Sequence, residues 1–278
     1  MADWQQLIAR NDPLPPGLSG HILISVDAGP ASTSNFPLLQ ISNLDGSGRR
    51  DLANGGWPAL SPDGTHLIYS DDKGAHLLDT TTGQGFPLVT GGSIPVWSPD
   101  GARIMVTTFS DLFMMQADGT GSQKISTVAA QMVNPIGFLP DNQSIVYSVY
   151  GEGYTFIIQN LQSGETKKLF PVMSKAGLGA LSPDGQWIAF SDRVFGGNGP
   201  GLFVSRLDES ERRLIAAPDV PAAFTPVWSP DSQWLLVSTS DNRRANPALA
   251  YRPMAIELAT CRVAALPPTQ GDVLGWSK

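Results

Sequence analysis

The chain has 278 residues with a formal net charge of −7, and only 15% of its residues are charged, against 29 glycines and 23 prolines. This balance predicts an all-β protein of short strands and tight turns, and the acidic charge argues against nucleic acid as a partner, because phosphate contacts require clustered Lys and Arg. The single cysteine, Cys261, excludes an internal disulfide and a multi-thiolate metal site, and no stretch reaches the ~18 apolar residues of a membrane-spanning helix.

Residues 1–17 precede the first predicted strand, and we interpret them as a leader or linker. They lack the basic start and the apolar run of a signal peptide. The first strand is predicted from Gly20 to Ser25, where apolar residues follow one another without interruption. Residues 18–278 are predicted to form a single domain.

A turn signature recurs along this domain. In each copy a Leu or an aromatic residue is followed by Ser-Pro-Asp-Gly or a close variant, and the copies begin at Leu60, Trp97, Phe138, Leu181 and Trp228. Their first residues are 37, 41, 43 and 47 positions apart, and Trp276-Ser277 begins a sixth copy 48 positions after Trp228. A period of this size is typical of repeat architectures.

An apolar run follows each complete copy of the turn. The runs are Leu67-Ile68-Tyr69, Ile104-Met105-Val106, Ile145-Val146-Tyr147, Ile188-Ala189-Phe190 and Leu235-Leu236-Val237. Continuous apolar runs predict strands that are covered on both faces. The sixth turn has no such run after it, and the missing run lies at Gly20 to Ser25, so the two ends of the domain are predicted to share one repeat unit.

Each repeat contains a second turn between apolar runs. These turns lie at Asp45-Gly46, Thr82-Gly83, Asp118-Gly119 and Ser163-Gly164, with weaker counterparts near Asp208-Glu209 and Ala259-Thr260. Asp-Gly in this context predicts a β-hairpin with a type I′ turn, in which both central residues have positive φ. Each unit therefore holds four strands.

Six units of four antiparallel strands, closed by pairing the N- and C-terminal strands in one unit, make a six-bladed β-propeller. The repeats resemble those of the TolB-like propeller family, and the nearest copies are Val96-Trp97-Ser98-Pro99-Asp100-Gly101 and Gln116-Ala117-Asp118-Gly119-Thr120-Gly121. The match runs from about residue 18 to 278. The resemblance implies a propeller fold shared with a periplasmic protein that binds a peptidoglycan-associated lipoprotein, with sensory modules, and with the non-catalytic propellers of prolyl-oligopeptidase-like enzymes.

The repeated aspartates are interpreted as turn residues and not as a ring of catalytic or metal-binding carboxylates. A Pro-Asp-Gly turn needs Asp to accept backbone N–H bonds and Gly to adopt positive φ, which accounts for Asp63, Asp100, Asp141, Asp184 and Asp231. The three histidines, His21, His66 and His76, lack the converging ligands that zinc requires, so no metal site is predicted. No Gly-x-Ser-x-Gly elbow marks a catalytic serine, so no catalytic residue is assigned.

In such a blade the Ser-Pro-Asp-Gly turn and the Asp-Gly hairpin lie on one face of the ring, named here the turn face. The opposite face, named the variable-loop face, carries the loops between second and third strands and the links between blades. It is predicted to contain Asp27 to Pro37, Asp71 to Gly74, Val149 to Tyr154, Asp192 to Gly201 and Asp241 to Ala248, and the links at Met132 to Asn134, Val172-Met173 and Pro221 to Phe224. The uneven parts of a repeat protein usually carry its function.

The variable-loop face therefore supplies the candidate ligand- or partner-binding residues. They are Asp71, Asp72, Met132, Tyr150, Glu152, Tyr154, Met173, Asp192, Arg193, Phe195, Phe224, Arg243 and Arg244. Aromatic and charged side chains around a funnel suit the binding of a protein, a peptide or a small molecule. The pair Arg243-Arg244 would suit a carboxylate on a partner.

We expect a non-enzymatic binding scaffold or sensor module, with no cofactor. The alternative is a propeller enzyme, a lyase or hydrolase, with a metal or carboxylates in the central channel, and a third hypothesis is a ring stabilised by structural calcium. We expect a bacterial monomer that works in the periplasm or at the cell surface, with a cytoplasmic location as the alternative. Neither membrane insertion nor nucleic-acid binding is expected.

Overall fold

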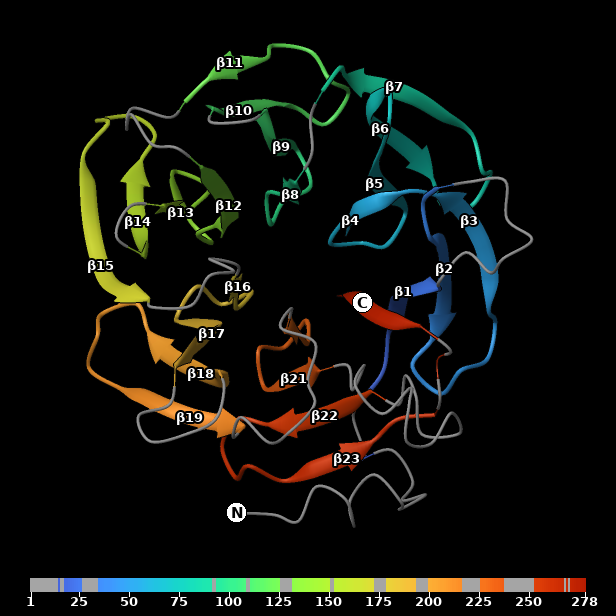
Figure 1. Cartoon of the computed structure of the whole chain (residues 1–278). Helices are drawn as coiled ribbons and strands as arrows, with labels where there is room; N and C mark the ends of the chain where they lie inside the picture. The colour runs from blue at the N-terminus through green and yellow to red at the C-terminus, as the bar shows by residue number, and fades with distance from the viewer. Residues whose placement is uncertain are drawn as a thin grey trace.

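Six four-stranded sheets are arranged radially around a centre in the computed structural model of the chain (Figure 1). The structure describes residues 15, 18–26, 35–91, 94–108, 111–125, 132–150, 153–172, 179–193, 200–216, 226–237, 253–267, 269 and 271–278. The described residues form β-strands and no helix, and neighbouring strands in each sheet are antiparallel. The prediction of an all-β, six-bladed propeller with four antiparallel strands per blade is confirmed.

The blades are numbered in chain order, and their strands are given from the centre outwards. Blades 1 and 2 contain β24 (Asp272–Ser277), β1 (His21–Val26), β2 (Leu38–Asn43) and β3 (Arg50–Asn54), then β4 (Gly56–Leu60), β5 (His66–Asp71), β6 (Gly74–Asp79) and β7 (Gly85–Val89). Blades 3 and 4 contain β8 (Pro95–Trp97), β9 (Arg103–Thr108), β10 (Asp111–Gln116) and β11 (Gln123–Lys124), then β12 (Val133–Phe138), β13 (Ser144–Tyr150), β14 (Tyr154–Asn160) and β15 (Thr166–Val172). Blades 5 and 6 contain β16 (Gly179–Leu181), β17 (Trp187–Arg193), β18 (Pro200–Arg206) and β19 (Arg212–Ala216), then β20 (Val227–Trp228), β21 (Trp234–Val237), β22 (Met254–Glu257) and β23 (Val263–Ala265).

The core of the protein lies between the blades. The innermost strands β4, β8, β12, β16, β20 and β24 each contact the innermost strand of both neighbouring blades, so they form a closed ring. Clusters of buried apolar side chains lie at all six junctions between neighbouring blades. A single sheet could not bury both of its faces, and stacking around the ring covers both.

The second strand of each blade is the most deeply buried, as the apolar runs predicted. In β9 the consecutive residues Ile104, Met105 and Val106 are fully buried, although their side chains alternate between the two faces of the sheet. Both faces of this strand are therefore covered by neighbouring blades.

The two ends of the domain meet in blade 1, where β24 pairs with β1. Ile22 lies opposite Trp276 and Ile24 opposite Val273, and Figure 1 shows β1 next to the C-terminal strand. The Trp276 indole also donates a hydrogen bond to the carbonyl of Ser19, at 3.0 Å. The predicted closure of the ring through its terminal strands is confirmed.

The Ser-Pro-Asp-Gly turns are held by their own side chains. In blade 3 the Ser98 hydroxyl donates to Asp100 Oδ1 at 2.6 Å and accepts the N–H of Arg103 at 2.9 Å, while Asp100 also accepts the N–H of Ala102 at 3.0 Å. Gly101 has φ of +70°, which a glycine adopts without strain. The bond from Ser98 and the bond from the Ala102 amide hold the pKa of Asp100 below its ordinary value.

The same turn is repeated around the ring. The carboxylates of Asp63, Asp184 and Asp231 accept equivalent bonds from a serine hydroxyl and a backbone amide. In blade 4 the serine is replaced by Leu139, and Asp141 accepts the N–H groups of Gln143 and Ser144 instead. These bonds support the interpretation that the repeated aspartates shape turns.

The hairpins at the second turn differ from the predicted type I′ geometry. At residues 43–47 the N–H of Gly46 donates to the carbonyl of Asn43 at 2.9 Å, and the N–H of Asn43 donates to the carbonyl of Ser47 at 2.8 Å. Gly46 has φ of +84°, whereas Asp45 is not among the residues with positive φ. The prediction was wrong because a type I turn followed by one left-handed residue uses the same Asp-Gly pair in a longer hairpin loop.

Tryptophans of the turn repeat also link neighbouring blades. The indole of Trp97 donates to the carbonyl of Ala59 at 3.0 Å, and the indole of Trp228 donates to the carbonyl of Ala180 at 2.8 Å. Each acceptor lies on the innermost strand of the preceding blade. The aromatic position of the repeat therefore contributes both to the core and to the ring of innermost strands.

Candidate functional site

The antiparallel strand order separates two kinds of connection. In blade 2 the turn between β4 and β5 and the hairpin between β6 and β7 lie at one end of the sheet. The short loop between β5 and β6 and the links to blades 1 and 3 lie at the other end. The described parts of the other blades follow the same order, so the turn face and the variable-loop face are on opposite sides of the ring.

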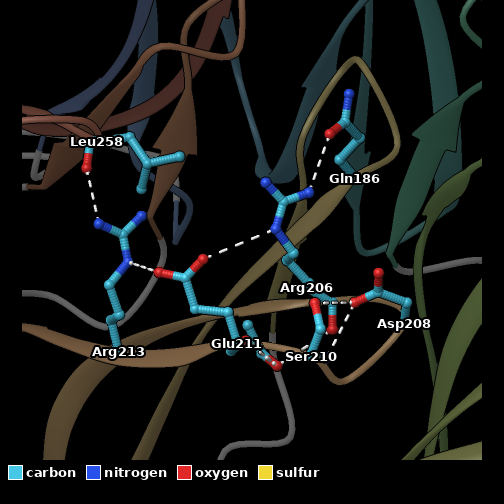
Figure 2. Close-up of polar contacts among 8 residues, drawn as sticks. Gln186, Arg206, Asp208, Ser210, Glu211, Arg213 and Leu258 are labelled. Carbon is cyan, nitrogen blue, oxygen red and sulfur yellow. Dashed lines mark hydrogen bonds and ion pairs between the residues drawn. The ribbon is translucent and has the colours of Figure 1, made fainter.

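Several arginines on the turn face are engaged within the fold. In Figure 2 the Glu211 carboxylate lies between two guanidinium groups, 2.8 Å from Arg213 Nε and 3.7 Å from Arg206 Nε. Arg213 also donates to the carbonyl of Leu258 in blade 6 at 3.1 Å, and Arg206 donates to Gln186 at 3.1 Å. Arginine therefore joins blade 5 to blade 6 across the turn face.

Two more arginines make the same type of bridge. Arg50 of blade 1 donates to the carbonyl of Thr80 in blade 2, and Arg103 of blade 3 donates to the carbonyl of Asn142 in blade 4. These guanidinium groups satisfy turn carbonyls that have no strand partner. These arginines therefore link neighbouring blades across the turn face.

Exposed apolar side chains gather at the other face. Among the described residues five large hydrophobic side chains are exposed, and three of them, Trp57 (52%), Met132 (47%) and Tyr150 (43%), lie at the variable-loop ends of their blades. The other two, Phe86 and Leu214, lie on the outermost strands of blades 2 and 5. Exposed aromatic residues and methionine are enriched at the centres of protein interfaces.

Met132, Tyr150 and Tyr154 form one cluster, named here the tyrosine platform. The ring of exposed Tyr150 lies 5.1 Å from the ring of buried Tyr154, at an interplanar angle of 55°. The Tyr154 hydroxyl donates to Met132 Sδ at 3.3 Å, and the Tyr150 N–H donates to the carbonyl of Met132 at 3.0 Å. The structure brings these three predicted residues together and ties the link before blade 4 to the loop of that blade.

Trp57 is a candidate residue that sequence reasoning missed. It is the second residue of β4, and a bulge between Gly56 and Ala59 places it opposite the part of β5 that contains Tyr69. Its φ of +48° is unusual for a bulky side chain. The sequence feature that could have identified Trp57 is the segment Gly55-Gly56-Trp57-Pro58, which departs from the repeat because an aromatic residue follows two glycines.

Asp71 and Asp72 occupy the β5–β6 loop of blade 2. Asp71 Oδ1 accepts the N–H of Lys73 at 2.8 Å and lies 2.8 Å from His76 Nε2, whose ring stacks on Tyr69 at 5.3 Å. Partial burial opposes ionisation of Asp71, yet the bonds from His76 and Lys73 lower its pKa overall. Burial, aided by the charge of Asp71, raises the pKa of the Tyr69 hydroxyl. Asp71 therefore organises its loop, while Asp72 is exposed at its tip.

Asp192 belongs to an ion pair between strands of blade 5. Its carboxylate is buried and lies 2.6 Å from Arg212 Nη2. The Arg212 guanidinium lies over Phe170, Phe190 and Phe203, with 5.5, 5.0 and 4.8 Å to the ring centroids. This aromatic enclosure at the junction of blades 4 and 5 gives Asp192 a structural role. Arg193 is the last residue of β17, in a blade opposite the one that carries Asp71.

The remaining predicted residues lie outside the described part of the chain. They are Glu152, Met173, Phe195, Phe224, Arg243 and Arg244. Their assignment to the binding face stays a prediction. Within the described ranges there is no group of three or more His, Cys, Asp or Glu side chains that could hold a metal ion, and there is no helix long and apolar enough to cross a membrane.

Comparison with known proteins gives one curated relative. No family model matches the chain. The uncharacterized peptidase YuxL of Bacillus subtilis (strain 168) is 28% identical over 142 residues, which are 48% of this chain and 21% of that protein. The chain therefore matches about a fifth of the length of this relative.

Solved structures show a broader likeness. TolB from Acinetobacter baumannii superposes with a TM-score of 0.74 at 19% identity, over 93% of this chain and 66% of that chain, which is just under two thirds of its length. A putative TolB from Agrobacterium tumefaciens gives a TM-score of 0.66 at 17% identity, over 94% of this chain and 92% of that chain. An oligogalacturonate lyase in complex with manganese gives 0.51 at 14% identity, over 84% of both chains. The resemblance to TolB-like propellers is confirmed at the level of fold: this chain is a six-bladed β-propeller that superposes on the TolB structures over nearly its whole length.

Proposed function

We propose that the protein is a binding scaffold whose variable-loop face holds a protein, a peptide or a small ligand. The observation that carries the proposal is the uneven distribution of exposed apolar side chains. Trp57, Met132 and Tyr150 are exposed on the variable-loop face, whereas the tryptophans of the turn repeats are packed between blades. Exposed apolar side chains that cluster, as Met132 and Tyr150 do, mark interaction sites more often than single exposed side chains do.

The tyrosine platform has the physical properties of a binding surface. Tyr154 is buried and hydrogen-bonded, so it fixes the ring of Tyr150 that packs on it. A fixed aromatic side chain loses little conformational entropy on binding. The flexible thioether of Met132 can adapt to the shape of a partner.

The proposal is tested by removing the exposed aromatic groups from the complete chain. A Trp57→Ser, Tyr150→Ser double variant is compared with wild type and with Phe86→Ser, which removes an equally exposed aromatic ring from an outer strand. Each protein is used for quantitative capture of partners from cells and for thermal-shift screening with peptides and metabolites. We expect partners that wild type and Phe86→Ser retain and the double variant loses. Equal retention by all three proteins would count against the variable-loop face.

We also propose that the protein acts outside the cytoplasm and that it is a monomer. The likeness in fold to TolB proteins supports it, and the single cysteine is compatible with an oxidising compartment. Fractionation of cells that express the full-length gene product checks the location. Light scattering of the purified chain checks the monomer.

The second candidate is a propeller enzyme, and one pair of side chains favours it. Asp71 and His76 form a carboxylate–imidazole pair on the variable-loop face, an arrangement that can orient a general base. The likeness to a manganese-containing lyase is a likeness of fold. A manganese-dependent rise in melting temperature, together with cleavage of oligogalacturonate that His76→Gln abolishes, would establish the enzyme. If manganese neither raised the melting temperature nor supported cleavage, the enzyme hypothesis would be rejected in favour of the binding scaffold.

A further inference from the structure

Met132 differs from the other methionines whose side chains the structure describes. Its side chain is 47% exposed, whereas Met105, Met114, Met115 and Met254 are buried. Its sulfur accepts the hydroxyl hydrogen of Tyr154, and its carbonyl accepts the N–H of Tyr150. The exposed thioether is therefore hydrogen-bonded directly to Tyr154, and the ring of Tyr150 packs on the ring of Tyr154.

We propose that Met132 is a site of oxidative modification, at which a hydroperoxide converts the thioether to a sulfoxide and rearranges the tyrosine platform. A lone pair on Sδ attacks one peroxide oxygen, the S–O bond forms and the O–O bond breaks. Sulfur loses two electrons and the peroxide gains two. The proton on the attacked oxygen passes to the departing oxygen, which leaves as water or an alcohol. Oxidation turns a flexible apolar side chain into a polar, chiral one.

The position of Tyr154 favours this product. Thioether sulfur is a weak hydrogen-bond acceptor, whereas a sulfoxide oxygen is a strong one. The Tyr154 hydroxyl, 3.3 Å from the sulfur, is already placed to donate to an oxygen bound there. Because this oxygen extends beyond the sulfur, the phenol must shift to keep the bond in range. The ring of Tyr150, which packs on Tyr154, shifts with it.

The proposal gives the variable-loop face a chemical control. A sulfoxide in the middle of the platform makes this surface more polar, so an apolar partner would bury it less favourably. This last step, weaker binding after oxidation, rests on the proposed function. The oxidation itself and the movement of the tyrosines do not depend on any partner.

The first experiment measures where the intact protein is oxidised. The folded chain is treated with hydrogen peroxide, and peptide mapping by mass spectrometry follows each methionine separately. We expect Met132 to be oxidised at least about tenfold faster than the four buried methionines, since susceptibility follows exposure. Equal rates for Met132 and the buried sites would overturn the proposal.

The second experiment follows the platform with protein labelled on its tyrosine rings. We expect the NMR signals of Tyr150 and Tyr154 to move on peroxide treatment, and methionine sulfoxide reductase with a thiol to restore them. Met132→Leu keeps the apolar volume and should make both signals insensitive to peroxide. Signals that stay fixed while mass spectrometry shows a sulfoxide at Met132 would refute the rearrangement. A failure to find any partner would instead contradict the proposed function.

Discussion

The turn face and the variable-loop face are made by the same six blades, but their side chains are used differently. On the turn face, hydroxyls and carboxylates hold the Ser-Pro-Asp-Gly turns, and arginines such as Arg213 reach carbonyls of the next blade. On the variable-loop face, Trp57, Met132 and Tyr150 expose apolar surface to solvent. Substitutions on the turn face should therefore lower stability, and substitutions on the variable-loop face should change binding.

The motif glycine Gly185 gives the largest expected loss of stability. A Cβ on Gly185 would lie 2.3 Å from Cδ of Pro140 in the neighbouring blade, and Gly185 has φ of +67°. Gly185→Ala therefore combines a left-handed backbone penalty of about 1–2 kcal/mol with an overlap costing about 1–3 kcal/mol. Urea denaturation should show a loss of about 2–5 kcal/mol.

Gly101→Ala is the matched control for this substitution. Gly101 has nearly the same φ of +70°, and no atom lies within 4 Å of the position that its Cβ would take. We expect this variant to lose only the backbone penalty of about 1–2 kcal/mol. If both variants lost the same free energy, the contact between blades 4 and 5 at Pro140 would not matter for stability.

The motif serine gives the next effect. Ser98 is fully buried, and its hydroxyl both donates to Asp100 and accepts the N–H of Arg103. Ser98→Ala should cost about 1–3 kcal/mol, because the partly buried Arg103 amide loses its acceptor. Ser163→Ala, in an exposed hairpin, should change the free energy of unfolding by less than about 0.5 kcal/mol. A comparable loss in both variants would show that the turn hydroxyl has no special role.

Acid should weaken the turn face. Hydrogen bonds from Ser61 and Ser98 hold the pKa values of Asp63 and Asp100 below the ordinary value. A carboxyl whose pKa is lower in the folded state adds stability above its unfolded pKa of about 3.9, and this contribution disappears as pH falls toward the folded pKa. The stability difference between wild type and Asp100→Asn should therefore be largest near neutral pH and shrink below about pH 4, as measured by urea denaturation across pH. A difference that stays constant down to pH 3 would contradict this account.

The sequence could predict the turn face because its interactions are local and repeated. The bond from Ser98 to Asp100 spans two residues, and every further copy of the repeat carries the same information. The apolar run after each turn also predicted the buried second strands. The hairpin type was predicted wrongly because Asp45-Gly46 fits two loop lengths, and only the register of the flanking strands separates them.

The sequence could not predict contacts that arise when distant segments pack together. The ion pair of Asp192 with Arg212 spans 20 residues and depends on the register of three strands. The bond from Tyr154 to Met132 joins a strand to the link that precedes its blade. Both residues of that bond were predicted as candidates from their position, but their contact follows from the packing of blade 4.

Trp57→Gly is expected to cost no stability, and the sign of its effect separates the two faces most clearly. A left-handed φ costs a non-glycine residue about 1–2 kcal/mol, whereas an added glycine costs about 0.5–1 kcal/mol of chain entropy. Because the Trp57 side chain is mostly exposed, its removal sacrifices little packing. Urea denaturation should show no loss, or a gain of up to about 1 kcal/mol.

Such a result, opposite in sign to that of Gly185→Ala, would mean that the indole is kept at a cost to folding, as expected for a residue that contacts a partner. A loss of 2 kcal/mol or more, as for a buried aromatic residue, would instead place Trp57 in the core of blade 2 and remove it from the binding face.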